Sequence, residues 1–268
     1  MEKNIIKKHS VVFAVILICL FVLTTYIPLH IPFGSIIIRI ILCAILIFYL
    51  YKNDLLYILR FNLLDFKQSI ISGILFLFFA IWVAVLNIIA YSSEFRISIA
   101  FWDFCFHVLM VGILEELCFR GLFINIYIKH REKVKSTIYK AVLLSSAFFG
   151  ICHYLNMIDQ PFMKTTAQVF GAFCLGVLFA AVYLKGMNIW VCALFHALWN
   201  FGNMYGSFLP DKNPEMYGIA GEMTLLQVAS SMIEPAIILI IGVFILRNIH
   251  KEKYISCIFH IDNHLYIK

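Results

Sequence analysis

The fold class is indicated most clearly by residues 68–91, which read QSIISGILFLFFAIWVAVLNIIAY. This segment contains no charged residue, and roughly 20 apolar residues are enough for a helix to cross a hydrocarbon core about 30 Å thick. Seven further apolar blocks of comparable length flank it, near residues 10–29, 34–51, 98–127, 138–157, 166–184, 188–205 and 225–246. The sequence therefore predicts an all-α polytopic membrane protein with about eight transmembrane helices, forming one integral membrane domain over residues 1–268.

The composition of the whole chain agrees with this prediction. Of the 268 residues, 63% are hydrophobic and 13% are charged, whereas a soluble domain is about half apolar and about a quarter charged. The formal net charge is +6, which by itself is compatible with nucleic-acid binding. The positive charges lie in the short connections between apolar blocks, however, where they set the orientation of a membrane protein. We therefore expect membrane lipid as a partner and no nucleic acid.

The basic residues also predict how the chain is oriented. Lys and Arg accumulate on the cytoplasmic side of membrane proteins. When the N-terminus is placed in the cytoplasm, only Arg96, Lys164 and Lys212 fall on the far side. The cytoplasmic set comprises Lys3, Lys7, Lys8, Lys52, Arg60, Lys67, Lys129, Arg131, Lys133, Lys135, Lys140, Lys185, Arg247, Lys251, Lys253 and Lys268. We expect both termini in the cytoplasm and a location in a cell membrane; the many Ile and Lys residues favour a bacterial plasma membrane.

Three polar clusters interrupt the apolar blocks within residues 98–205. They read EELCFR at residues 115–120, FGICH at residues 149–153 and HALWN at residues 196–200. Ionisable groups inside a bilayer are costly, and they usually face a bundle interior and mark function. The sequence therefore predicts that a functional core is formed by the helices within residues 98–205.

Helical spacing sorts the members of the first and third clusters. Glu116 and Arg120 are four residues apart, share a helix face and can form an ion pair. Glu115 lies about 140° from Arg120 around a regular helix, so it is expected to remain unpaired and available as a general base or acid. His196 and Asn200 also share a face and can present an imidazole and a carboxamide to one target.

Depth within the membrane suggests that the clusters meet. At about 1.5 Å per residue, Glu115, His153, His196 and Asn200 all lie near the middle of the bilayer. We therefore expect one pocket lined by these four side chains. Each cluster also has a purely structural interpretation, because His, Asn and ion pairs hydrogen-bond neighbouring membrane helices. Phe149, one turn before His153, is interpreted as a packing residue.

The ordered motifs Glu-Glu-x-x-x-Arg, Phe-x-x-x-His and His-x-x-x-Asn resemble those of a known family. This is the CAAX protease and bacteriocin-processing (CPBP, or ABI) family of intramembrane proteases, which includes the type II CAAX prenyl endopeptidases. The resemblance implies an eight-helix fold whose active-site cavity opens toward the cytoplasm. It also implies that Glu115 and His153 activate water, and that His196 and Asn200 stabilise the oxyanion. By the same likeness, Glu116 and Arg120 hold the first motif in place.

The function expected from these residues is hydrolysis of a peptide bond in a hydrophobic peptide or membrane-anchored protein. A metal-free mechanism is favoured, because the sequence lacks the H-E-x-x-H spacing of zinc proteases. If Zn²⁺ is bound, Glu115, His153 and His196 are its expected ligands. Two alternatives remain: a non-catalytic immunity or regulatory scaffold of the same family, and a proton-coupled transporter, although no internal repeat supports the latter.

Overall fold

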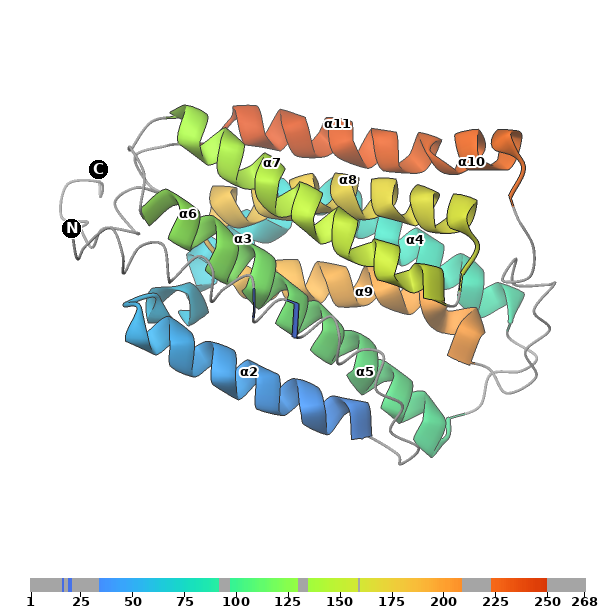
Figure 1. Cartoon of the computed structure of the whole chain (residues 1–268), viewed down its shortest axis with the longest axis horizontal. Coiled ribbons are helices and arrows are strands. Elements are labelled where there is room, and N and C mark those ends of the chain that lie inside the picture. The colour runs from blue at the N-terminus through green and yellow to red at the C-terminus, as the bar shows by residue number, and fades with distance from the viewer. Residues whose placement is uncertain are drawn as a thin grey trace.

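The computed structural model describes residues 34–91, 97–129, 135–158, 160–208 and 223–249, together with residues 16, 19 and 20. Within these ranges the chain forms helices and no strand, which confirms the predicted all-α class (Figure 1). The predicted span 10–29 lies almost wholly outside the described residues, and so do both termini.

The described helices occupy the ranges of the other seven predicted spans, and they run back and forth along one long direction (Figure 1). Most of them are α-helices, and three short segments are 3-10 or π-helices. Their bounds are α2 Gly34–Lys52, η1 Leu56–Leu59, α3 Leu63–Ser72, α4 Ile74–Ala90, α5 Ile99–Glu116, η2 Leu117–Ile124, α6 Asn125–Lys129, α7 Lys135–Cys152, η3 His153–Ile158, α8 Phe162–Gly186, α9 Ile189–Phe208, α10 Leu225–Ser231 and α11 Ile233–Arg247.

Several of these helices are suited to a membrane. Among the described residues, three segments are long and apolar enough to cross one: Ser136–Ile158, Phe162–Gly186 and Leu225–Arg247. The pair α3 and α4 would make a fourth if the two are counted as one bent span. The apolar helices thus indicate a membrane protein, while the eight crossings and the cytoplasmic termini stay predictions.

The predicted span over residues 68–91 consists of two helices, α3 and α4, rather than one. Helix α3 begins earlier, at Leu63, because the Asn62 side chain accepts a hydrogen bond from the backbone N–H of Leu64 at 2.8 Å and so caps the helix. The chain then bends by 71° between α3 and α4. The break falls at Gly73, where the Phe195 ring occupies the space that a Cβ atom would need. A glycine lets the bend pack directly against α9.

The core of the bundle is centred on α8, which packs on α7 and α11, while α9 packs on α4 and α5. Every side chain from Val177 to Leu184 is at most 2% exposed. A helix that is buried all around its circumference is expected to be apolar throughout. This explains why residues 177–184 contain no charged side chain, and it makes α8 the support against which the polar clusters lie.

We predict that Gly112→Ala destabilises the protein, because α5 and α9 approach closely at this glycine. An added Cβ would lie 2.7 Å from the Ala193 carbonyl oxygen and 3.0 Å from the Ala197 nitrogen, both backbone atoms. Overpacking of this kind typically costs about 1–3 kcal/mol, measurable as a loss of unfolding free energy in detergent. The matched control is Gly171→Ala, whose Cβ would meet Pro235 at an ordinary 3.7 Å; equal losses for both variants would contradict the prediction.

Candidate active site

The ion pair predicted between Glu116 and Arg120 is present at the end of α5 and the start of η2. Arg120 Nη1 donates to Glu116 Oε1 at 2.8 Å, and both side chains are 0% exposed. The guanidinium carbon lies 4.7 Å from the centre of the Phe149 ring and 5.6 Å from that of Phe179. Arginine is attracted to aromatic faces by a cation–π interaction, so these two rings stabilise the buried charge. Phe179 is a member of the site that no motif in the sequence indicates.

The π-helix η2 follows the glutamate pair directly, and Asn125 holds its end. The Asn125 amide donates to the Arg120 carbonyl at 3.0 Å and to the Gly121 carbonyl at 2.7 Å, and it also contacts the Tyr183 hydroxyl at 2.9 Å. Its carbonyl oxygen accepts from the Tyr57 hydroxyl at 2.9 Å. A π-helix shifts backbone hydrogen bonds away from the α pattern, and such segments frequently occur at functional sites. Asn125 therefore stabilises the backbone from which Arg120 projects.

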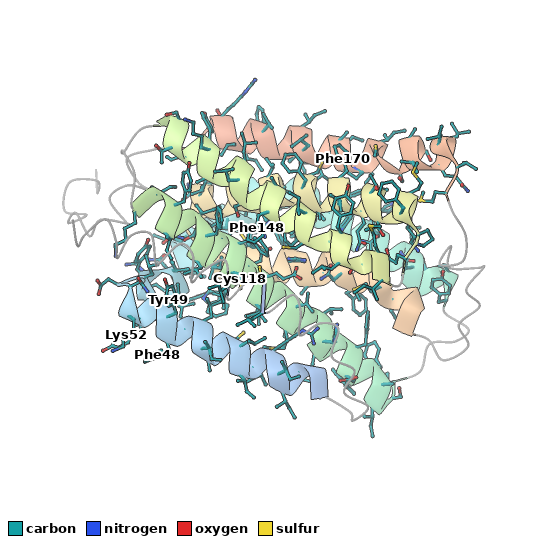
Figure 2. All side chains as sticks on the ribbon, in the orientation of Figure 1. Phe48, Tyr49, Lys52, Cys118, Phe148 and Phe170 are labelled. Carbon is teal, nitrogen blue, oxygen red and sulfur yellow. The ribbon has the colours of Figure 1, made fainter. Side chains whose placement is uncertain are left out.

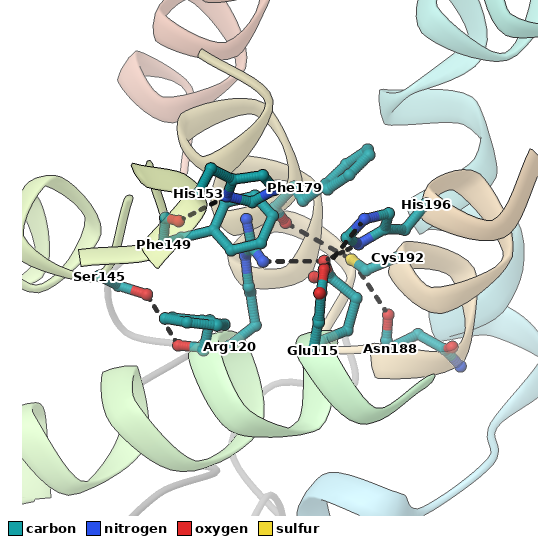
Figure 3. Close-up of polar contacts among 11 residues, drawn as sticks. Glu115, Arg120, Ser145, Phe149, His153, Phe179, Asn188, Cys192 and His196 are labelled. Atoms are coloured by element: carbon teal, nitrogen blue, oxygen red, sulfur yellow. Dashed lines mark hydrogen bonds and ion pairs between the residues drawn. The ribbon is translucent and has the colours of Figure 1, made fainter. Parts of the chain in front are cut away.

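His196 contacts both of the adjacent glutamates, and Figure 3 shows it beside Glu115. Its Nδ1 is 2.8 Å from Glu116 Oε1, and its Nε2 is 3.3 Å from Glu115 Oε2. The prediction that Glu115 is left without a partner is therefore wrong. Helical spacing within one segment excluded only Arg120 as a partner of Glu115. The partner comes instead from α9, which packs closely against α5. The Glu115 side chain is 14% exposed and His196 is 4% exposed, so the pair is largely shielded.

The contacts of His196 define where its protons lie. Glu116 is paired with Arg120 and is therefore a carboxylate, so His196 Nδ1–H must donate to it. The second ring nitrogen then faces Glu115. That contact is favourable only if one proton lies between the two groups, as an imidazolium beside a carboxylate or as a neutral ring beside a carboxylic acid. The contact between His196 and Glu115 is thus an ion pair when the imidazole is protonated.

Helix α7 ends at Cys152, and His153 is the first residue of the 3-10 helix η3. The predicted span 138–157 is therefore not one regular α-helix. His153 Nδ1 is 2.9 Å from the Phe149 carbonyl oxygen, and an acceptor there means that Nδ1 carries the proton. In the neutral ring, Nε2 is then a free acceptor. The Phe149 ring lies 4.9 Å from the His153 ring and 5.7 Å from the His196 ring, nearly perpendicular to both. Phe149 thus positions both histidines, as well as packing against Arg120.

A cavity of about 430 Å³ joins the second and third motifs. His153, His196 and Asn200 line it together with Phe149, so the structure brings these predicted residues to one space. Glu115 is not among the lining residues and meets the cavity through His196. The walls contributed by α8 and α11 include Leu175 and Ile238 and are largely apolar. This arrangement suits a hydrophobic ligand with a few polar contacts.

The direction in which this cavity extends differs from the expectation. It reaches Lys164 in the first turn of α8 and Glu234 in the first turn of α11. Lys185 and Arg247, which belong to the predicted cytoplasmic side, lie at the opposite ends of the same helices. The family resemblance implies an opening toward the cytoplasm, whereas the basic residues place the cytoplasm at the other end. For this cavity the two expectations disagree.

The residues suggested as zinc ligands do not form a metal site in the part of the chain that the structure describes. No group of three or more His, Cys, Asp or Glu side chains is arranged there to hold a metal ion. His196 already contacts a carboxylate through each of its nitrogens, so it could coordinate a metal only by giving up one of these contacts. The arrangement of Glu115, His153 and His196 therefore does not fit the zinc alternative.

Taken together, the fold and the polar cluster define a helical membrane protein with carboxylate, imidazole and amide groups around an internal cavity. Residues 96–202 match the family model described as type II CAAX prenyl endopeptidase Rce1-like. No curated protein and no solved structure gives a significant match. The matched segment contains all three motifs, and the match supports the assignment to the CAAX protease family that was made from them.

Proposed function

We propose that the protein is an intramembrane endopeptidase that hydrolyses a peptide bond with a water activated by Glu115. The observation that supports this most strongly is the shielded contact of 3.3 Å between Glu115 and His196, beside a cavity lined by His153 and Asn200. Amide hydrolysis needs a base for the water and donors for the developing oxyanion. The family whose model matches residues 96–202 is a protease family, which agrees with this chemistry.

The steps follow from the groups available. The Glu115 side chain does not line the cavity but is 14% exposed beside it, and it takes one proton from the water while the water oxygen attacks the peptide carbonyl carbon. His153 Nε2 accepts a hydrogen bond from the other water hydrogen and so orients the attack. The amide N–H of Asn200 stabilises the oxyanion. When the carbon–nitrogen bond breaks, Glu115 returns its proton to the leaving amine, which leaves a carboxylic acid and an amine as products.

The contacts of His196 favour a positioning role over the oxyanion role that the family resemblance implies. Each of its ring nitrogens is directed at a glutamate. It can therefore hold Glu115 in place and share a proton with it, while Glu116 and Arg120 in turn hold His196. Supporting contacts of this kind keep a reactive carboxylate in one orientation, which is a large part of enzymatic rate enhancement.

The substrate class follows from the surroundings of the site. The cavity walls are mostly apolar and the helices indicate a membrane protein. We therefore propose a hydrophobic peptide, or the membrane-proximal segment of an anchored protein, as the substrate. A bacterial plasma membrane remains the proposed location, and membrane lipid the surrounding partner.

We expect Asn200→Ala to lower kcat about 10²–10³-fold, because the loss of one oxyanion donor typically has this effect. The measurement is cleavage of quenched fluorescent hydrophobic peptides by the purified protein in lipid vesicles. Asn87→Ala is the matched control: this residue lies on α4, outside the cavity, and its amide donates to the Val83 carbonyl at 3.0 Å. Equal rates for wild type and Asn200→Ala would contradict the role of Asn200.

A further inference from the structure

Glu234 is an acidic residue of α11 that the proposed mechanism does not use, and it borders two cavities. It lines the cavity that contains His153, His196 and Asn200. It also lines a second cavity of about 580 Å³ between α4 and α11. Apart from Glu234 and a serine, the second cavity is wholly apolar, with Leu75, Phe76, Phe79, Ile233, Ile237, Ile238 and Ile241 as its walls.

Among the residues that the structure describes, no ion pair of the Glu234 carboxylate is found, although Lys164 lines the same cavity. The ion pairs found there involve other carboxylates, at positions 65, 115 and 116. Asp and Glu within membrane segments are costly, and they usually pair with another group or mark a ligand pathway. An acid kept at the junction of a polar and an apolar cavity therefore requires an explanation other than packing.

Helix contacts place Glu234 near the level of the candidate active site. The neighbouring Pro235 lies against Gly171 of α8, since a Cβ at that glycine would be 3.7 Å from Pro235 Cγ. Two residues along α8, Phe173 lies against Gly150, where a Cβ would be 3.3 Å from Phe173 Cβ. Gly150 is three residues before His153. The carboxylate thus lies beside the site, at about the height of His153, rather than at the far end of the bundle.

We propose that Glu234 binds a lysine or arginine side chain of the substrate, and that the apolar cavity between α4 and α11 holds the hydrophobic segment next to that basic residue. This inference rests on the proposed protease function and names its substrate class: peptides in which a basic residue borders an apolar run. Three features support it together: the negative charge without an ion pair among the described residues, the apolar walls on one side of it, and the continuity with His153 and Asn200 on the other. Glu234 is partly buried, and a charge-assisted contact is about twice as strong as one between neutral groups.

The test uses three quenched fluorescent peptides of equal length, each with an apolar run of alanine and leucine. The run is followed by lysine in the first peptide, glutamine in the second and glutamate in the third. For the purified wild type in phosphatidylcholine vesicles, we expect kcat/KM for the lysine peptide to exceed that for the glutamine peptide about tenfold, through KM. Glu234→Gln should abolish this preference, and Glu234→Lys should transfer it to the glutamate peptide. The control is Asp65→Asn, which removes a carboxylate of α3 that pairs with Arg60. This variant should keep the preference for the lysine peptide.

The possible outcomes separate this inference from the proposed function. Cleavage of all three peptides without a preference, or a lysine preference that survives in Glu234→Gln, would overturn the inference alone. Absence of cleavage of every peptide by the wild type would overturn the protease function and the inference with it. A third outcome concerns lipid. If the cleavage rate depends on Glu234 and changes when phosphatidylethanolamine is added to the vesicles, but does not depend on the lysine of the peptide, the carboxylate binds a lipid amine and the inference is overturned.

Discussion

Glu115→Gln is expected to lower kcat about 10⁴-fold, the largest effect on activity in this protein. Glutamine keeps the size of the side chain and can still hydrogen-bond His196, but it cannot take a proton from water. A positioned general base contributes up to about 10⁴-fold to rate, and the same carboxylate is needed to protonate the leaving amine. The rate of peptide cleavage by purified protein in vesicles, together with the thermal unfolding temperature, measures this prediction.

The matched control for this variant is Asp103→Asn, which removes a carboxylate from the same helix three turns earlier. It should retain most of the activity if both variants are folded. A folded Glu115→Gln protein that cleaves at a rate comparable to the wild type would exclude Glu115 as the base. A cellular phenotype that persists when Glu115, His153, His196 and Asn200 are all replaced by alanine would instead favour the non-catalytic scaffold.

Arg120→Met is expected to lower the free energy of unfolding by roughly 3–5 kcal/mol, the largest effect on stability. Removing one member of a fully buried ion pair leaves the other charge uncompensated, and here both side chains are 0% exposed. The Glu116 carboxylate would retain only His196 as a partner, and Phe149 and Phe179 would lose the cation between their rings. Denaturant unfolding in detergent, followed by tryptophan fluorescence, measures the change.

Two further variants test the cause of this loss. Arg60→Met removes an arginine that is 64% exposed and 3.8 Å from Asp65; exposed pairs contribute at most about 1 kcal/mol, so little change is expected. The double variant Arg120→Met with Glu116→Gln should recover part of the stability, since the stranded charge is gone. A loss in Arg120→Met no larger than that in Arg60→Met would show that the pair does not hold the site together.

Local spacing in the sequence was sufficient to predict some of these features. The apolar blocks predicted the positions of seven described helical segments, because burial and membrane insertion both require long apolar runs. The four-residue spacing of Glu116 and Arg120 predicted their ion pair, because such residues share a helix face. The three motifs predicted which side chains belong together, and the match over residues 96–202 supports the family.

Features that depend on how helices pack against one another could not be predicted in this way. The contact between Glu115 and His196 requires the register of α5 against α9, which is set where Gly112 meets the Ala193 backbone. The π-helix η2 also depends on distant groups, since Asn125 is held by Tyr57 and Tyr183. A single sequence carries no direct signal for such pairings. The bend at Gly73 is a partial exception, because a glycine inside an apolar run can mark a break.

The position of the second cavity adds a feature that no motif contains. Figure 2 shows side chains filling the spaces between the helices, and the two cavities adjoin each other along α11. Glu234 and Ile238 contribute to both of them. The polar and the apolar cavity thus meet at these two side chains. Substitutions in the first half of α11 are expected to affect substrate choice more than chemistry.

The most direct test of the account compares the peptides in membranes of cells that carry the native gene with those of cells that carry Glu115→Gln. If the carboxylate at position 115 drives peptide hydrolysis inside the membrane, a defined set of fragments from hydrophobic or membrane-anchored proteins disappears in the variant while the intact precursors accumulate. Identical sets of fragments and precursors, at equal amounts of folded protein, would contradict the account.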